Sequence, residues 1–307
     1  MPVPEQLRKG LAIPAIAAPM FLVSGPDLVV EACRAGVIGA FPSLNQRSTS
    51  GYQEWLSEIE ERLSHSTASR YGVNLIVHRT NERLQADLEV TVRCRVPLVI
   101  TSLGAVREIV DAVHSYGGVV FHDVIHLHHA RKAAAAGVDG LIAVCAGAGG
   151  HAGSLNPFAF IAEIRAFFEK TVILAGSITN GRQIAAAQLL GADLAYLGTR
   201  FIATRESLAA DEHKQMILNS AAKDIVYTPS ISGVNANFLR ASIAAAGLDP
   251  DHLPPAGELR MDEEAKVWKQ IWSAGQGVGN IHDIPATADL CSRLAREYSE
   301  ARSVPVP

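Results

Sequence analysis

The stretch AVCAGAGGHAGS, residues 143–154, sets one histidine among several glycines directly after an apolar run. Glycine adopts backbone conformations that are closed to other residues, and it lets the chain approach a ligand closely. Imidazole is the side chain best suited to take up a proton near neutral pH. We therefore interpret His151 as a catalytic base on a loop whose Gly149 and Gly150 contact a ligand. The alternative is a surface loop with an incidental histidine.

Two further segments combine small residues, hydroxyl groups and backbone N–H groups: AGSITNG at residues 175–181 and LGTR at residues 197–200. The first segment also leads into a predicted helix, and the N-terminus of a helix carries partial positive charge. This combination predicts a phosphate-binding site, with tight turns that bind nothing as the alternative. The residues expected to form the site are Gly176, Ser177, Gly198 and Thr199.

Residues at the ends of other apolar runs complete the predicted site. The sequence Ala18-Pro19-Met20 has no side-chain donor and suits a flat apolar ring, although it also fits an ordinary strand end. Asn74 stands inside the apolar run YGVNLIV, where a buried amide without a partner carries a large free-energy cost. We therefore expect a partner for Asn74, which is either a ligand atom or a group on a neighbouring strand.

A group of histidines follows the run GVVFHDV. His122 belongs to the end of that run and is expected to point toward the site, whereas His126, His128 and His129 begin a helical pattern. A metal site is disfavoured because no second cluster of Cys, Asp or Glu stands at ligand spacing. We therefore expect no metal, and we place the three later histidines on a solvated helix start.

Eight short apolar runs alternate with amphipathic patterns of helical period along the chain. Strands that are buried on both faces have continuous apolar sequences, and their alternation with helices predicts a parallel sheet. Eight such units predict an α/β fold, a (β/α)8 TIM barrel, in which the loops after the strands form the active site. A doubly wound open sheet is the weaker alternative, because no strand is followed by GxGxxG. The eight runs are AIPAIAAPM, VIGAFPS, YGVNLIV, PLVITSLG, GVVFHDV, GLIAVCAG, TVILAGS and LAYLGT.

The pattern changes after the eighth unit. The segments YTPSISGVNANFLR and GLDPDHLPP predict turns, a short helix and loop, which we interpret as a small cap at the barrel mouth. The segments EEAKVWKQIWSAG and IPATADLCSRLAREYSEAR predict two C-terminal helices. The predicted division is a barrel over residues 1–221, a cap over 222–258, and helices over 259–307 that pack back on the barrel.

Composition excludes several classes of partner. The net charge of the 307 residues is −4 and no Lys/Arg cluster stands in the sequence, which argues against nucleic acid. Four widely spaced cysteines without a CxxC pair predict reduced thiols in a cytoplasmic protein. The apolar run near the N-terminus is broken by Pro14 and Pro19, is needed as the first strand, and is too short to span a membrane.

These motifs together resemble the FMN-dependent nitronate monooxygenases, once called 2-nitropropane dioxygenases. NAD(P)H-dependent flavin oxidoreductases and FMN enoyl-acyl carrier protein reductases share the barrel of that family. The resemblance extends over most of the chain, and its glycine-histidine motif is the most specific part. It rests on APM at 18–20, GVNL at 72–75, GAGGHAG at 147–153, AGSITNG at 175–181, YLGTRFIAT at 196–204 and WSAGQGVG at 272–279.

The resemblance implies a cofactor and a reaction. It implies oxidation of a nitronate, or of a nitroalkane deprotonated by His151, with O2 to a carbonyl product and nitrite. An NAD(P)H-dependent reductase of quinones or of an enoyl thioester is the alternative enzyme, and a non-catalytic flavin-binding or phosphate-binding module is a third hypothesis. The expected partners are a small-molecule substrate and O2, and a homodimer is compatible with the sequence. FMN is expected to contact Asn74, Gly149, Ser177, Tyr196, Leu197, Gly198 and Thr199.

The chain departs from the family pattern at three places. The family usually has Glu-Ala-Gly-Gly-His before its histidine, whereas Ala146-Gly147-Ala148 provides no carboxylate here. Val144 stands where the family has a glutamine that binds the flavin ring, and His122 stands where relatives often have lysine. These differences leave the substrate and the flavin potential open.

Overall fold

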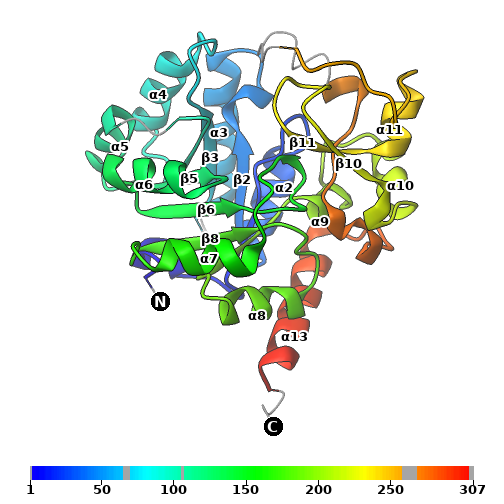
Figure 1. The fold of residues 1–307 in the computed structure, drawn as a ribbon. Helices are drawn as coiled ribbons and strands as arrows, with labels where there is room; N and C mark the ends of the chain where they lie inside the picture. Colours follow the sequence, from blue (N-terminus) through cyan, green and yellow to red (C-terminus); the bar gives the residue numbers. More distant parts are fainter. Residues whose placement is uncertain (1, 65–69, 105–106, 258–267, 304–307) are drawn as a thin grey trace.

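The chain forms a closed barrel of eight parallel strands, as predicted, in a computed structural model that describes residues 2–64, 70–104, 107–257 and 268–303 (Figure 1). β1 pairs with both β2 and β9 through Ile16, which lies opposite Ile38 on one side and Tyr196 on the other. This double pairing closes the barrel. The strands are β1 (Ala15–Ala17), β2 (Ile38–Pro42), β3 (Gly72–Ile76), β4 (Leu98–Ser102), β5 (Val119–Val124), β6 (Gly140–Val144), β8 (Thr171–Ala175) and β9 (Leu194–Leu197).

Helices follow the strands and cover the outside of the barrel. Several begin where the sequence offers a start signal: Ser48 caps α3 by accepting from Gly51 N at 3.1 Å, and Asn156 caps α7. The helices of this layer are α2 (Pro26–Arg34), α3 (Thr49–Leu63), α4 (Leu84–Arg93), α5 (Arg107–His114), α6 (Leu127–Ala136), α7 (Pro157–Arg165) and α8 (Gly181–Leu189), with α1 (Glu5–Arg8) before the barrel and η1 (Ser43–Asn45) after β2.

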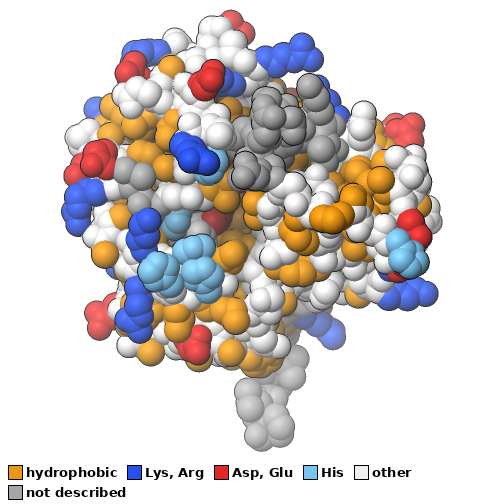
Figure 2. Space-filling view, turned by 45° about the horizontal axis from the view of Figure 1, so that its top comes forward, with side chains coloured by type: hydrophobic (Ala, Val, Ile, Leu, Met, Phe, Trp, Pro, Cys, Tyr) orange, Lys and Arg blue, Asp and Glu red, His pale blue; other side chains and the backbone are white. Residues whose placement is uncertain are grey.

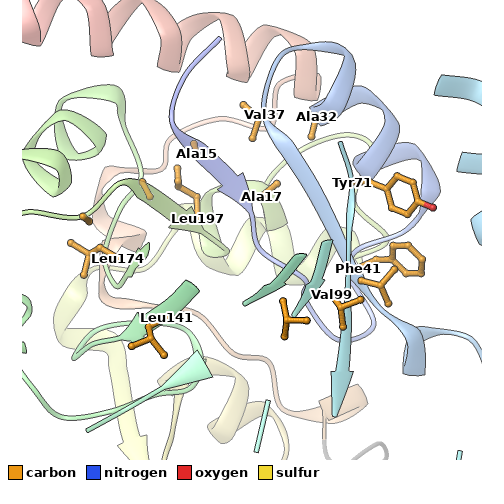
Figure 3. Close-up of a cluster of buried hydrophobic side chains, with 14 of the residues drawn as sticks. Ala15, Ala17, Ala32, Val37, Phe41, Tyr71, Val99, Leu141, Leu174 and Leu197 are labelled. Atoms are coloured by element: carbon orange, nitrogen blue, oxygen red, sulfur yellow. The ribbon is translucent and has the colours of Figure 1, made fainter. Parts of the chain in front are cut away.

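The strands bury side chains on both faces, which explains their continuous apolar sequences. Ile16, Ile100 and Ile142 fill the barrel interior. The alternate positions, such as Leu141 and Leu197, pack between the strands and the helices, where Figure 3 shows them with their neighbours. Each fully buried Leu or Ile contributes about 2 kcal/mol, so this two-layer core is the main source of stability.

The cap contains a sheet that the sequence did not reveal. The predicted turn, short helix and loop over residues 222–258 instead begin with η2 (Ala222–Asp224) and continue as two antiparallel strands and one helix. The apolar residues of these strands alternate too briefly, beside Pro229 and Gly233, to give a strand signal. The elements are β10 (Ile225–Thr228), β11 (Ala236–Leu239) and α11 (Arg240–Ala245), preceded by α9 (Thr199–Ile202) and α10 (Asp211–Leu218).

The C-terminal part returns from the cap to the barrel. Of the predicted helix EEAKVWKQIWSAG, residues 263–267 lie outside the described residues, residues 268–270 are helical, and the chain is then extended until η3 (Gln276–Asn280). The last helix, α13 (Thr287–Ser303), packs on α8 and α2 (Figure 1). It therefore takes the place of the helix that should follow the eighth strand. The domain boundaries at residues 221 and 258 stay a prediction.

Two sequence-level expectations can be compared with the described residues directly. The four cysteines are free thiols, and Cys33, Cys145 and Cys291 are buried. Burial raises the pKa of each of these three thiols to about 12, so they are protonated and unreactive at neutral pH. Within the ranges that the structure describes, no helix is long and apolar enough to cross a membrane.

The contact between α8 and α13 requires glycine at the first residue of α8. A Cβ atom on Gly181 would overlap backbone atoms of Leu294 and Tyr298 in α13. We expect Gly181→Ala to lower the free energy of unfolding by about 1–3 kcal/mol, since such overpacking moves backbone. Urea unfolding measures this loss. Gly257→Ala is the control, because nothing lies within 4 Å of its Cβ position; equal stability of both variants would contradict the packing argument.

Candidate active site

A cavity of about 1510 Å³ opens at the carboxyl ends of the barrel strands. Figure 2 shows this face of the molecule, with a hollow near its centre. Loops from the whole ring of strands contribute to the cavity, which confirms that the predicted site residues come together from distant parts of the sequence. The predicted residues that line it are Ala18, Pro19, Met20, Asn74, His122, Gly149, Gly150, His151, Gly176, Ser177, Tyr196, Gly198 and Thr199.

Leu197 is the exception among the predicted residues. It does not line the cavity, and its side chain is fully buried between the barrel and the helices. Side chains of a strand alternate between its two faces, so the neighbour of the cavity-facing Tyr196 must point outward. The Leu197 side chain therefore faces the helices, and a contact between this residue and a cofactor would have to involve its backbone.

The cap holds the loop that carries His151. Gly150–His151 forms a short strand, β7, which pairs antiparallel with β11 by placing His151 opposite Ala236. Ser273 accepts a hydrogen bond from Gly150 N at 2.6 Å, and Asn237 donates from Nδ2 to Ala148 O at 2.7 Å. The histidine thus lies on a sheet edge rather than on a free loop. A fixed backbone keeps the imidazole at a constant place in the cavity.

The glycines of the histidine loop allow two backbone segments to touch. A Cβ atom on Gly149 would lie 2.9 Å from Gly275 N, and one on Gly275 would lie 2.5 Å from Gly147 O. Gly147 also has φ +83 and would bring a Cβ atom against the Ser177 hydroxyl. These glycines therefore have a packing role that the sequence alone did not separate from the predicted approach to a ligand.

Four residues that line the cavity at the ends of β8 and β9 have backbone N–H groups without an acceptor among the described residues. These groups belong to Gly176, Ser177, Gly198 and Thr199. Ser177 reaches this position with φ +55, a left-handed conformation. Converging N–H groups form an anion-binding concavity, so this donor set fits the phosphate of a mononucleotide.

The N-terminus of α8, which is expected to add to that anion site, already has acceptors for two of its N–H groups. Gly181 N donates to Glu297 Oε2 at 2.8 Å, and Gln183 N donates to Asn180 Oδ1 at 2.9 Å. Side chains of the protein have therefore already taken up the free N–H groups of this helix. The phosphate donors must come from the turns at the ends of the strands instead.

A chain of hydrogen bonds crosses three neighbouring strands at the cavity floor. Asn74 Nδ2 donates to Ile100 O at 3.1 Å and to Ser102 Oγ at 2.7 Å, so the amide does bind a neighbouring strand. Ser102 Oγ then donates to Asp123 Oδ2 at 2.5 Å. Asp123 Oδ1 is buried and has no hydrogen-bond partner in the described part of the chain. A carboxylate oxygen therefore stands ready to accept from a bound ligand.

Asp123 is the functional candidate that the sequence analysis missed. Burial raises the pKa of Asp123 to about 6, against the opposing effects of the Ser102 hydrogen bond and of nearby His151. A perturbed carboxyl in a cavity is a frequent property of functional sites. Its signal in the sequence was an acidic residue within the apolar run GVVFHDV, next to the more conspicuous His122.

Two other histidines of the cavity are neutral at neutral pH. Burial lowers the pKa of His122 to about 4, and its Nδ1 lies 2.8 Å from the Thr101 hydroxyl. Burial also lowers the pKa of His213 to about 4, and its ring stacks on Trp272 at 5.1 Å between centroids. Both side chains therefore line the cavity as uncharged groups.

His126, His128 and His129 lie where the sequence placed them, at the start of α6. His126 accepts from His129 N at 3.3 Å as the helix cap, and His128 and His129 are exposed. Among the residues that the structure describes, no group of three His, Cys, Asp or Glu side chains could hold a metal ion.

Asp123 gives the protein a defined pH dependence of stability. A pKa raised from 3.8 to about 6 stabilises the fold below about pH 4, and this contribution, about 3 kcal/mol, is lost as the pH rises through 6. We expect Asp123→Asn to become progressively more stable than the unaltered protein between pH 4 and 8, as measured by urea unfolding. The exposed Asp111→Asn serves as control; parallel stability curves for Asp123→Asn and the unaltered protein would contradict the prediction.

The chain as a whole can be compared with known proteins. The chain is 28% identical to a nitronate monooxygenase of Paraburkholderia phytofirmans, over 95% of this chain and 94% of that protein. It is 27% identical to a (3aS,4S,5R,7aS)-5-hydroxy-7a-methyl-1-oxo-octahydro-1H-indene-4-carboxyl-CoA dehydrogenase of Rhodococcus jostii, over 94% and 93%. A nitroalkane oxidase structure from Streptomyces ansochromogenes superimposes with a TM-score of 0.86 and 24% identity, over 97% and 99%. The sequence model of the nitronate monooxygenase family matches residues 7–297, so the chain belongs to that family of flavin-dependent oxidoreductases.

Proposed function

We propose that this enzyme binds FMN and oxidises alkyl nitronates or nitroalkanes with O2, giving a carbonyl product and nitrite. The observation that supports this most directly is the placement of His151 in the same cavity as four acceptor-free backbone N–H groups. A proton acceptor and an anion site in one cavity are what a phosphorylated cofactor and a carbon acid require. The visible spectrum of the purified protein tests the cofactor, and nitrite release tests the reaction.

The cavity offers each part of FMN a suitable surface. The N–H groups of Gly176, Ser177, Gly198 and Thr199 would hold the phosphate. Ala18, Pro19 and Met20 would provide an apolar wall for the ring system, and the Asn74 amide lies on β3, two strands from β1 and opposite β8 in the barrel order. When bound, the flavin supplies the redox chemistry, and the protein supplies position and charge.

The protein's own part in the reaction is proton transfer at His151. The imidazole would take the proton from the carbon beside the nitro group, and the substrate becomes an anion. The Asp123 carboxylate, which interacts electrostatically with His151, favours the imidazolium that this step creates. Trp268 lies edge-on to His151 at 5.7 Å between ring centroids. A preformed nitronate would not need this step.

A second candidate is an NAD(P)H-dependent reductase of quinones or of an enoyl thioester. The cavity of about 1510 Å³ favours it, because ligand sites usually measure 300–1,000 Å³ and this one could hold a second large molecule beside a flavin. Anaerobic mixing distinguishes the two. Rapid bleaching of the flavin by NADH or NADPH supports the reductase, whereas bleaching by a nitronate alone supports the oxidase.

Replacement of the base should affect two substrates unequally. We expect His151→Ala to lower kcat/KM for a neutral nitroalkane by about 100-fold or more, since general bases contribute 10²–10⁴-fold, and for a preformed nitronate by less than about tenfold. Nitrite release measures both reactions. His128→Ala, at an exposed histidine on α6, is the control. Equal losses on the two substrates would count against His151 as the base.

A charge in the proposed phosphate site should expel FMN. Asp and Asn both tolerate the left-handed backbone of Ser177, so Ser177→Asp and Ser177→Asn differ mainly in charge. We expect the aspartate variant to lose bound flavin by repulsion of the phosphate and the asparagine variant to keep it. Flavin absorbance per protein absorbance measures the occupancy. Full occupancy in the aspartate variant would refute the site.

A further inference from the structure

The amide of Asn74 has one orientation that suits its neighbours. Its Nδ2 atom donates to Ile100 O at 3.1 Å, and a backbone carbonyl oxygen can only accept. The reversed amide would place Oδ1 against that carbonyl, so that two acceptors would face each other. The same Nδ2 atom lies 2.7 Å from Ser102 Oγ, and Ser102 is therefore the acceptor in this hydrogen bond. The carbonyl of Ile100 thus determines which way the amide points.

This orientation decides the direction of the next hydrogen bond. A hydroxyl group has one proton to donate, and the Ser102 oxygen already accepts from Asn74. The Ser102 proton is therefore available to Asp123 Oδ2, which lies 2.5 Å from the serine oxygen. A short contact between a hydroxyl group and a carboxylate is typical of a charge-assisted hydrogen bond. Oδ2 of Asp123 is thus held as an acceptor.

Only the other oxygen of Asp123 can carry its proton. Oδ1 is buried and has no hydrogen-bond partner among the residues that the structure describes. When Asp123 is protonated, its proton must lie on Oδ1, because Oδ2 receives the proton of Ser102. Burial favours this neutral form and raises the pKa of Asp123 to about 6, whereas the Ser102 hydrogen bond favours the carboxylate. Ser102 therefore opposes the neutralisation of Asp123.

The ionisable groups around Asp123 come from three elements. On its own strand, His122 is neutral because burial lowers its pKa to about 4. On β9, Tyr196 is neutral because burial and Asp123 raise its pKa well above the usual value. On the loop after β6, His151 lowers the pKa of Asp123. The strands β3 and β4 contribute the uncharged amide and hydroxyl described above, and the β6 residue opposite Asp123 is the apolar Ile142. The charge of Asp123 is therefore coupled to that of His151.

We propose that Asn74 and Ser102 are positioning residues for proton transfer at His151. They hold Asp123 as a carboxylate, and its negative charge supports the positive charge that the imidazole gains when it takes a proton from the substrate. Neither side chain needs to touch the reacting atoms in this role. The inference rests on the proposed function and extends it, because the strength of the base then depends on two residues of β3 and β4.

The test uses serine variants of the full chain with FMN present. Ser102→Ala removes the donor, whereas Ser102→Thr keeps a hydroxyl group on a β-branched side chain that suits a strand. Ser102→Cys has nearly the same shape and only a weak donor, so it should act in the same direction as alanine if the alanine variant does not fold. Ser57→Ala is the control, because Ser57 is exposed on α3 and donates to Gln53 O at 3.1 Å.

The pH dependence of stability reports the ionisation of Asp123. Its contribution to stability is present at low pH and is lost as the pH rises through its pKa. A lost hydrogen bond to a charged group lowers the ratio of carboxylate to acid about tenfold to a hundredfold, so Ser102→Ala should delay that loss by about one to two pH units. Urea unfolding at a series of pH values measures the delay. In an Asp123→Asn background, the same substitution should cause none.

The pH dependence of the rate reports whether this ionisation affects the base. For a neutral nitroalkane, the acid limb of kcat/KM should move upward by about one pH unit in Ser102→Ala, and Ser102→Thr should restore it. For a preformed nitronate, which needs no base, the limb should stay in place. Both limbs should also stay in place in Ser57→Ala. Nitrite release measures these rates.

Two results would overturn the proposal. One is a stability contribution that Ser102→Ala and the unaltered protein lose at the same pH, and the other is an equal shift of the acid limb for the nitroalkane and the nitronate. A serine that only packs would change the height of the rate profile and not its position. If the unaltered protein releases no nitrite from either substrate, the proposed function fails, while the stability curves still support or overturn the control of Asp123 by Ser102.

Discussion

The site depends on a contact between two stretches of backbone, the histidine loop and the segment around Gly275. Both stretches must be glycine where they meet, because Cβ atoms on Gly149 or Gly275 would overlap the opposite chain. This contact, together with the pairing of β7 and β11, fixes the height of His151 above the barrel. Without it the loop would be free to move, and the imidazole would not stay in the same cavity as the acceptor-free N–H groups. The proposed roles of the other site residues depend on that fixed position of His151.

The ionisable groups at the floor of the cavity differ in environment from those at its rim. At its floor, burial keeps His122 neutral and makes Asp123 titrate near neutral pH, with pKa values of about 4 and about 6. At its rim, the exposed side chains of Arg47, Arg79 and Lys132 add positive charge. A ligand that enters therefore passes from a charged, hydrated region to a site where proton affinity is set by desolvation.

Much of the barrel could be predicted from the sequence, because buried parallel strands require continuous apolar runs and each run here is bounded by turn residues. The parts that could not be predicted depend on contacts between distant residues. Neither β10 nor β11 has a long apolar pattern, and they exist because β11 satisfies its backbone hydrogen bonds with β10 on one side and with β7 on the other. The outward direction of Leu197 follows from strand register, which became clear only when Tyr196 was placed. Asp123 was overlooked because its raised pKa comes from burial by other strands.

α13 completes the ring of helices, but in the sequence it follows the cap instead of following the eighth strand directly. This order affects how such a protein can diversify. The cap begins after the eighth strand and ends before the helix that completes the ring, so both of its ends are anchored on the same scaffold. A change in the cap sequence would alter the surface that covers the cavity and would leave the closed barrel unchanged. Only β11 is not free to vary, since its backbone must still pair with β7. Evolution could therefore replace almost the entire cap of this enzyme, provided that the replacement still pairs one strand with β7, which carries His151.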